Sequence, residues 1–186
     1  MNRKMGVAVL FVAMLAVTAV VLLGMGRTPF GPDNVPGLWC GDIWSKQNSQ
    51  RLADPYTFTH LLHGLAFFGL LWLAARKLPL RFRFLLAVFL EAAWEVVENS
   101  NMVIQRYREA TVSLGYFGDS VLNSTGDILA MSAAFLFASR ISWRVSVFIF
   151  ISLEIVLALW IRDNLILNII MLIHPIQAVK TWQLGG

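Results

Sequence analysis

The chain has 186 residues, of which 58% are hydrophobic and 14% are charged. Soluble domains contain roughly 45–50% apolar and about 25% charged residues, so this composition excludes an ordinary soluble fold and predicts a membrane-embedded protein. The formal net charge is +4, but the basic residues lie in short segments between apolar runs, so we expect no nucleic-acid partner. The single cysteine, Cys40, excludes a disulfide framework within the chain and a zinc site built from several cysteines.

Five apolar segments predict membrane-spanning helices, each of which needs about 20 residues to cross a bilayer. In chain order they are residues 5–24, 57–75, 84–98, 120–137 and 145–160. The first is longer than the apolar stretch of a signal peptide, which has about 7–15 residues, and we interpret it as an uncleaved helix. The predicted fold class is therefore all-α, a polytopic transmembrane helical bundle that forms one domain over residues 1–186.

A sixth apolar segment, Leu165–Ile173, is followed directly by His174 and Pro175. Nine residues are too few to cross a bilayer, and proline removes a helical hydrogen bond. The segment is therefore either a kinked sixth span that continues to Val179 or a re-entrant, interfacial piece. We favour the kinked span.

The short loops between these spans predict the orientation, because cytoplasmic loops are enriched in Lys and Arg. With the N-terminus in the cytoplasm, the inner segments carry the basic residues Arg3, Lys4, Arg76, Lys77, Arg81, Arg83, Arg140 and Arg144. These inner segments contain no Asp or Glu. The outer segments, about residues 27–56 and 99–119, carry charges of both signs, so we place both outside.

Ionisable and polar residues within the predicted spans gather near their outer ends. They are His60 and His63 in the second span, Glu91, Glu95 and Glu98 in the third, and Asp119, Asn123 and Asp127 at the start of the fourth. A charge near the bilayer centre costs about 2.5–3.5 kcal/mol on insertion scales. Residues four apart share a helix face, so three helices each carry a polar stripe at one depth. The pattern predicts a common cavity that opens to the outside.

This cluster predicts chemistry at the outer surface of the membrane. His, Glu and Asp side chains bind Zn²⁺, Mn²⁺ or iron, and a buried Glu can act as a general acid or base. We predict catalytic roles for His60, Glu95, Asp119 and Asp127. The predicted ligands of a divalent metal ion are His60, His63, Glu91, Glu95 and Glu98.

The segment between the third and fourth spans offers further groups to a substrate. Arg106, Tyr107 and Arg108 are the predicted substrate-binding residues there, together with Asn123, because guanidinium groups bind phosphate and carboxylate. In an equally favoured alternative, the two arginines neutralise the acidic helix ends. Glu154, within the fifth span, is interpreted as part of a hydrogen-bonded network that fixes the register of the helices.

Several segments also carry a resemblance to a known family. They are LEAAWEVVENS at residues 90–100, together with residues 106–111, 118–124, 162–165 and 173–175. In these segments the chain resembles an uncharacterised family of small bacterial inner-membrane proteins, of the domain of unknown function 2585 type. More distantly it is similar to VanZ-like membrane proteins, whose Asp-x3-Asn-x2-Gly helix is matched by Asp119, Asn123 and Gly126. The resemblance implies a multi-pass protein of the bacterial inner membrane and no particular reaction.

Three classes of function are compatible with these features. The first is an enzyme, a hydrolase or transferase that acts on a lipid or lipid-linked substrate at the outer leaflet with the help of a metal ion. The second is a non-enzymatic accessory or lipid-binding subunit, which binds membrane lipids or a protein partner in the membrane. Ion or proton transport is the least favoured, because the inner halves of the spans, residues 69–75 and 128–138, are almost wholly apolar.

Overall fold

The computed structural model describes residues 3–185. Over these residues the chain forms helices, and the only strand-like pairing is an isolated bridge between Trp39 and Ala53. The helices are α1 (Arg3–Gly24), α2 (Thr57–Ala75), α3 (Leu80–Glu98), α4 (Asn101–Ala110), α5 (Val121–Ala138), α6 (Trp143–Trp160), α7 (Leu165–Ile173) and α8 (Gln177–Gln183). The all-α fold class predicted from the sequence is confirmed.

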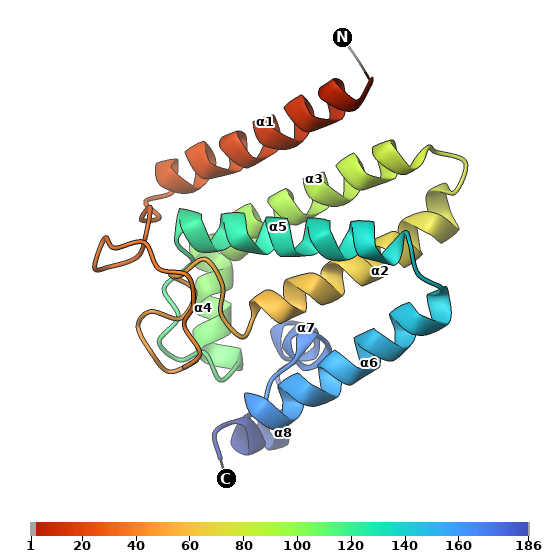
Figure 1. Ribbon diagram of the computed structural model, residues 1–186. Coiled ribbons are helices and arrows are strands. Elements are labelled where there is room, and N and C mark those ends of the chain that lie inside the picture. The colour runs from red at the N-terminus through yellow and green to blue at the C-terminus, as the bar shows by residue number, and fades with distance from the viewer. Residues whose placement is uncertain (1–2, 186) are drawn as a thin grey trace.

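Five long helices, α1, α2, α3, α5 and α6, form a bundle with two distinct ends (Figure 1). The tight turns α2–α3 and α5–α6 lie at one end, together with the start of α1, and we call this the turn end. The segment 25–56, α4 and the segment 111–120 lie at the opposite end, which we call the loop end. This arrangement brings together each set of segments that the sequence assigned to one side of the membrane.

The pair α2 and α5 forms the centre of the bundle. A Cβ atom at Gly64 would overlap the Met131 carbonyl oxygen and the Phe135 amide nitrogen, so the two backbones approach closely because this residue has no side chain. Small residues allow such contacts between membrane helices, where close packing replaces the hydrophobic effect. Ile128, Met131 and Phe135 of α5 form the apolar core with α3.

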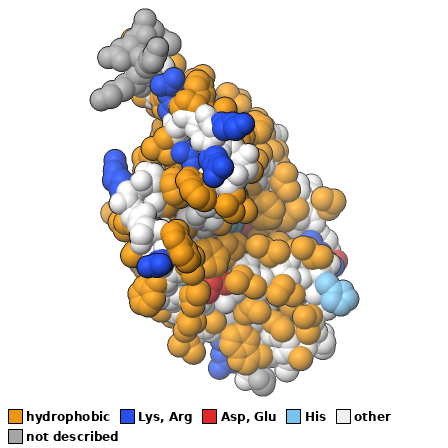
Figure 2. All heavy atoms as spheres, turned by 90° about the vertical axis from the view of Figure 1, so that its right-hand side faces the viewer, with side chains coloured by type: hydrophobic (Ala, Val, Ile, Leu, Met, Phe, Trp, Pro, Cys, Tyr) orange, Lys and Arg blue, Asp and Glu red, His pale blue; other side chains and the backbone are white. Residues whose placement is uncertain are grey.

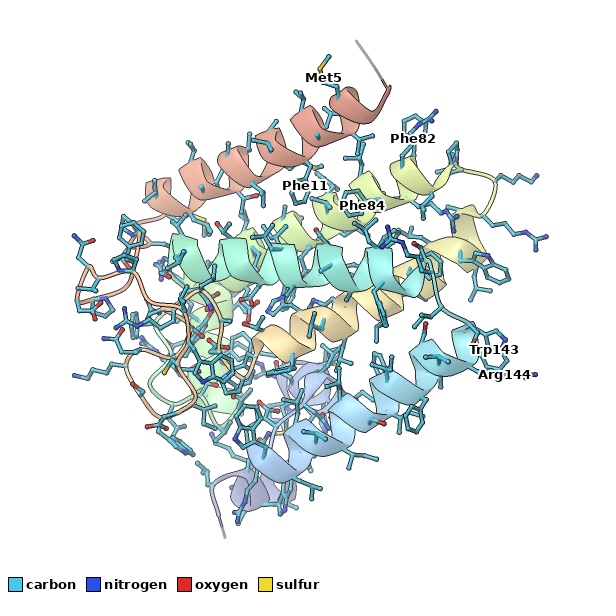
Figure 3. All side chains as sticks on the ribbon, in the orientation of Figure 1. Met5, Phe11, Phe82, Phe84, Trp143 and Arg144 are labelled. Carbon is cyan, nitrogen blue, oxygen red and sulfur yellow. The ribbon has the colours of Figure 1, made fainter. Side chains whose placement is uncertain are left out.

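Helix α1 packs on the outer face of α3. Phe11 and Phe84 point toward one another across this contact, with ring centroids 5.8 Å apart (Figure 3). Most of the other apolar side chains of α1 are exposed, which is the pattern expected of a helix that faces lipid on most of its surface.

Four helices, α1, α2, α5 and α6, are long and apolar enough to cross a membrane. Helix α3 has the required length of 19 residues, but it carries two arginines and three glutamates. It runs beside the others within the bundle (Figure 1). It also begins at Leu80, four residues before the predicted start, because Pro79 precedes the helix and fits its first turn.

The turn end is basic. Figure 2 shows this end of the molecule, with blue basic side chains scattered over a largely hydrophobic surface. Trp143 and Arg144 begin α6 there and point away from the bundle (Figure 3). Tryptophan and basic residues are enriched where a helix leaves the hydrocarbon core, so this end has the features of a membrane boundary.

The C-terminal segment corrects one prediction. Helix α7 ends at Ile173, His174 and Ile176 are extended, and α8 begins as a separate helix at Gln177. The expected continuous, kinked span up to Val179 is therefore wrong, because Pro175 cannot continue the helical hydrogen bonding. In Figure 1 α7 is viewed end-on while the five long helices lie in the plane, so it crosses the bundle at a steep angle.

The segment 99–119, predicted as an outer loop, contains the ten-residue helix α4. Ser100 caps its first turn by accepting a hydrogen bond from the Val103 amide. Its buried residues Ile104, Tyr107 and Ala110 recur at intervals of three, so one face packs onto the bundle. The segment 27–56 contains no helix, and an ion pair of 2.6 Å between Asp33 and Arg51 connects two parts of it.

Candidate functional site

Two histidines of α2 share one carboxylate of α3. The Nδ1 atom of His60 lies 2.5 Å from Glu91 Oε1, and the Nδ1 atom of His63 lies 3.0 Å from Glu91 Oε2. An ionised carboxylate can only accept hydrogen bonds, so both Nδ1 atoms donate. The partner therefore fixes the tautomer, and each neutral ring keeps a lone pair on Nε2.

Around His60, acceptors outnumber donors. Its Nε2 atom lies 3.8 Å from Asp127 Oδ2, and its Nδ1 atom lies 3.5 Å from Glu95 Oε1. Neither carboxylate oxygen of Glu95 has a hydrogen-bond partner, and Asp127 Oδ1 has none either, although all three atoms are buried. Buried polar atoms are nearly always paired. This group of facing acceptors therefore requires protons, water or a cation to complete it.

A third carboxylate, Asp119, lies just before the capping residue of α5. It accepts hydrogen bonds from Asn99 Nδ2 at 2.8 Å and from the Tyr116 hydroxyl at 2.9 Å, and its own amide donates to Asn99 Oδ1 at 2.7 Å. Burial raises the pKa of Asp119 from its ordinary value of 3.8 to about 6, although the Tyr116 and Asn99 hydrogen bonds oppose the shift. A carboxyl group with this pKa can exchange a proton near neutral pH.

These groups border a single cavity of about 920 Å³. His60, His63, Glu98, Asp119 and Asp127 all line it, as do Tyr107 and Asn123. Glu91 and Glu95 are fully buried on α3 next to His60. The sequence-based prediction that the polar residues of α2, α3 and α5 gather in one cluster is therefore confirmed, and this cluster lies beside one cavity. The predicted opening of that cavity to the outside stays a prediction.

Two predicted substrate-binding residues have clear structural partners at the cavity wall. Asn123 Nδ2 donates to the Arg51 carbonyl oxygen at 2.8 Å and lies 3.5 Å from Asp54 Oδ2, so it holds the segment 25–56 over the site. The Tyr107 ring is buried and meets the Tyr116 ring edge-on, with centroids 5.2 Å apart. Both still present atoms to the cavity.

The other two, Arg106 and Arg108, do not line the cavity. Arg106 donates to the carbonyl oxygens of Leu172 and Ile173 at 2.8 and 3.2 Å, so it satisfies the C-terminal end of α7. Arg108 donates to the Tyr116 carbonyl oxygen. Neither arginine forms an ion pair with the acidic residues at the helix ends. The alternative in which the arginines neutralise these residues is therefore not seen in the structure either. Both bind backbone, which sequence spacing could not reveal.

Two further buried carboxylates lie outside this group and are fully engaged. Glu154 of α6 accepts hydrogen bonds from the amides of Leu165 and Ile166 at 3.0 and 3.2 Å, and thereby caps α7. The structural interpretation of Glu154 is confirmed. Asp163 accepts from the Asn164 amide at 2.9 Å and from the side chains of Gln183, Asn168 and Tyr56 at 3.0, 3.2 and 3.4 Å.

The sequence-based reasoning gave no role to Asn99 and Tyr116, the residues that orient Asp119. Asn99 directly follows Glu98, the last residue of the Glu91–Glu95–Glu98 stripe. Its position in the sequence therefore indicates that it lies close to the site. Tyr116 comes from a Gly-rich segment without helical periodicity, and only the folded chain brings it to Asp119.

The histidine and glutamate side chains of this site are suited to bind a divalent metal ion. Ligand atoms of His60, Glu95 and Glu98 lie within 4.8 Å of one another, and so do those of His60, His63 and Glu91. Mixed imidazole and carboxylate sets bind zinc, manganese or iron. Because Glu91 already accepts hydrogen bonds from both histidines, the first set has more free acceptor atoms.

The comparisons with known proteins identify the family. Residues 22–185 match the sequence model of the family described as Protein of unknown function (DUF2585). The chain belongs to this family.

Several bacterial proteins are similar to this chain over most of its length. A UPF0314 protein of Sinorhizobium fredii is 49% identical over 99% of this chain and 95% of its own length. A UPF0314 protein of Sphingopyxis alaskensis is 45% identical over 94% of this chain and 93% of its own. One of Paracoccus denitrificans is 46% identical over 91% and 88%. No solved structure matches the chain.

Family membership confirms the first resemblance predicted from the sequence, whereas the more distant similarity to VanZ-like proteins stays a prediction. The family match and the four apolar helices together show that the chain is a helical membrane protein of the DUF2585 family. The cluster of histidines and carboxylates is a feature of its fold.

Proposed function

We propose that this protein is a metal-dependent membrane enzyme, a hydrolase or transferase that acts on a lipid or lipid-linked substrate at the outer leaflet. The observation that carries the proposal is the group of buried, facing acceptors formed by Glu95, Asp127 and His60 Nε2. A cation held by His60, Glu95 and Glu98, whose ligand atoms lie within 4.8 Å of one another, would supply the missing partner of Glu95, and protein cavities rarely keep such atoms unpaired.

In this proposal each residue has a distinct part. Glu91 orients His60 and His63 through their Nδ1 atoms, as carboxylates commonly do behind metal-binding histidines. His60, Glu95 and Glu98 supply ligands, with Asp127 beside them. These residues would hold the ion, and its chemistry there would be the polarisation of a phosphoryl or carbonyl oxygen or the activation of a water molecule. Asp119, whose pKa burial raises to about 6, serves as the general acid or base at the cavity wall.

The location follows from the charge distribution. We place the turn end in the cytoplasm because the α2–α3 and α5–α6 turns are rich in arginine. The loop end, with the cavity and the exposed Trp39 and Trp44, then lies at the outer surface of the bacterial inner membrane. Membrane lipids are the partners that this position provides.

The deciding experiment is elemental analysis of the protein purified in a mild detergent, together with His60→Ala and Glu95→Gln. We expect about one zinc, manganese or iron ion per chain in the wild type and loss of most of it in both variants. Glu109→Gln, on the exposed face of α4, is the matched control and should keep the metal. A wild-type protein without metal, with all variants equally folded, would leave the accessory, lipid-binding function as the better explanation.

A further inference from the structure

The cavity has two chemically different parts. Its polar part is formed by the histidines and carboxylates described above. One apolar part of its lining, away from the side chains of the loop end, is formed by Phe67 and Leu70 of α2, Leu90 and Trp94 of α3, and Ile169 and Leu172 of α7. None of these six side chains had a role in the site predicted from the sequence.

The apolar part extends along the bundle axis, away from the loop end. Leu70 follows His63 by seven residues on α2, which places it about 10 Å closer to the turn end. A ligand that touches both residues therefore lies lengthwise between the helices, with one end among the carboxylates and the other beside apolar side chains.

The apolar part is open at its side. Leu70, Leu90 and Ile169 are 60%, 39% and 48% exposed, although all three border the cavity. Helix α3 packs against α1, α2, α4 and α5, and α7 packs against α4 rather than closely against α3. The gap between α3 and α7 is therefore lined by side chains that a bilayer would cover with lipid chains.

The two parts together define the class of ligand. A wholly polar ligand would leave the apolar walls in contact with water, and a wholly apolar one would leave Asp127 Oδ1 without a polar partner. A molecule with a polar end and a hydrocarbon chain satisfies both parts. We infer that the cavity binds one hydrocarbon chain of a membrane amphiphile, which enters sideways from the bilayer between α3 and α7. This inference rests on the proposed function for the position of the polar end.

The test uses the full chain in vesicles of phosphatidylethanolamine that contain phosphatidylglycerol with a photoreactive diazirine on one acyl chain. After illumination, mass spectrometry measures labelling at Phe67 and Trp94 inside the cavity. Phe148 of α6, which is 71% exposed, reports labelling by surrounding lipid in the same sample. We expect Phe67 and Trp94 to be labelled as strongly as Phe148.

Matched pairs of variants then test the route. Leu90→Trp should lower labelling at Phe67 about tenfold, because a bulky ring fills the apolar part, whereas Phe89→Trp, on the neighbouring exposed position, should not. Leu70→Trp and Leu73→Trp form a second pair on α2, and both tryptophans replace exposed leucines that folding tolerates. Equal labelling within each pair would contradict the inference, as would unlabelled Phe67 and Trp94 beside labelled Phe148.

The same samples are analysed for metal, so that the two proposals fail separately. If the cavity residues are labelled in a protein that contains no metal, the inference of a site for a hydrocarbon chain stands and the proposal of a metal-dependent enzyme fails. Metal in a protein whose Phe67 and Trp94 stay unlabelled would do the reverse. Chemical cross-linking of two copies through α3 and α7, with loss of lipid labelling, would assign the gap to a protein contact and overturn the inference.

Discussion

Two pairs of buried carboxylates make a useful comparison. Glu95 and Asp127 lie between α2, α3 and α5, whereas Glu154 and Asp163 lie where α6, α7 and α8 meet. All four are almost completely inaccessible. Glu154 and Asp163 accept hydrogen bonds on both oxygens, but Glu95 accepts none and one oxygen of Asp127 has no partner. Burial alone therefore does not separate a structural carboxylate from a functional one, whereas the pairing of its oxygens does.

The physical reason is the cost of desolvation. Moving a charged group out of water costs several kcal/mol of desolvation free energy. In the folded protein this cost is offset only when hydrogen-bond donors or a cation contact the group. Amide and side-chain donors supply the compensation at Glu154 and Asp163. Around Glu95 the chain supplies mainly further acceptors, so the compensation must come from outside the chain.

Asp163→Ala should have the largest effect on stability. The substitution leaves donors from Tyr56, Asn164, Asn168 and Gln183 without their acceptor, and breaking a buried network of this kind costs about 4 kcal/mol. Thermal and denaturant unfolding in detergent should show the loss. Metal content should be unchanged, because Asp163 itself is not among the residues that line the cavity. A variant as stable as the wild type would show that the network is not a structural element.

The pH dependence of stability should report Asp119. Burial raises its pKa from the ordinary value of 3.8 to about 6, so folding favours the protonated form. The resulting stability is fully present below about pH 4 and is lost as the pH rises through about 6. For a shift of this size the loss amounts to about 3 kcal/mol. Unfolding midpoints measured between pH 4 and 7 should fall along this range.

Asp119→Asn isolates this contribution. Asn99 and Tyr116 both donate to the same oxygen of Asp119, which the amide oxygen of asparagine can replace, so the fold is retained while the titration is removed. The variant should show a shallower pH dependence than the wild type. Glu109→Gln removes an exposed carboxylate and should leave the slope unchanged. Identical slopes for the wild type and Asp119→Asn would rule out the raised pKa.

Much of the fold was predictable because it depends on local properties of the chain. The predicted bounds 57–75 coincide with those of α2, since a mainly apolar run there is followed by basic residues and a proline. The apolar segment Leu165–Ile173 coincides with α7, although the favoured prediction extended this helix to Val179. The site was predictable where it depends on helical periodicity, as in the stripe of Glu91, Glu95 and Glu98.

The remaining features depend on contacts between distant segments. Arg106 was expected to bind a substrate, but its partners are carbonyl oxygens 66 and 67 residues away. Helix α4 is too short to give a membrane-like apolar run, and its stability comes from packing on one face. The division between paired and unpaired carboxylates likewise requires the position of every donor, which no spacing rule supplies.

The smallest effect should come from Glu154→Gln, and it offers the cleanest comparison with Glu95→Gln because the chemical change is the same. Glutamine keeps one acceptor, so one of the two α7 amides that Glu154 caps loses its partner together with the favourable charge at the helix N-terminus. The cost should be about 1 kcal/mol, measured by unfolding in detergent. Glu95→Gln loses no hydrogen bond and removes a buried charge, so its stability without metal should equal or exceed that of the wild type. If Glu95→Gln were the less stable of the two in the metal-free protein, Glu95 would be a structural residue like Glu154, and the unpaired oxygens would not indicate a binding site.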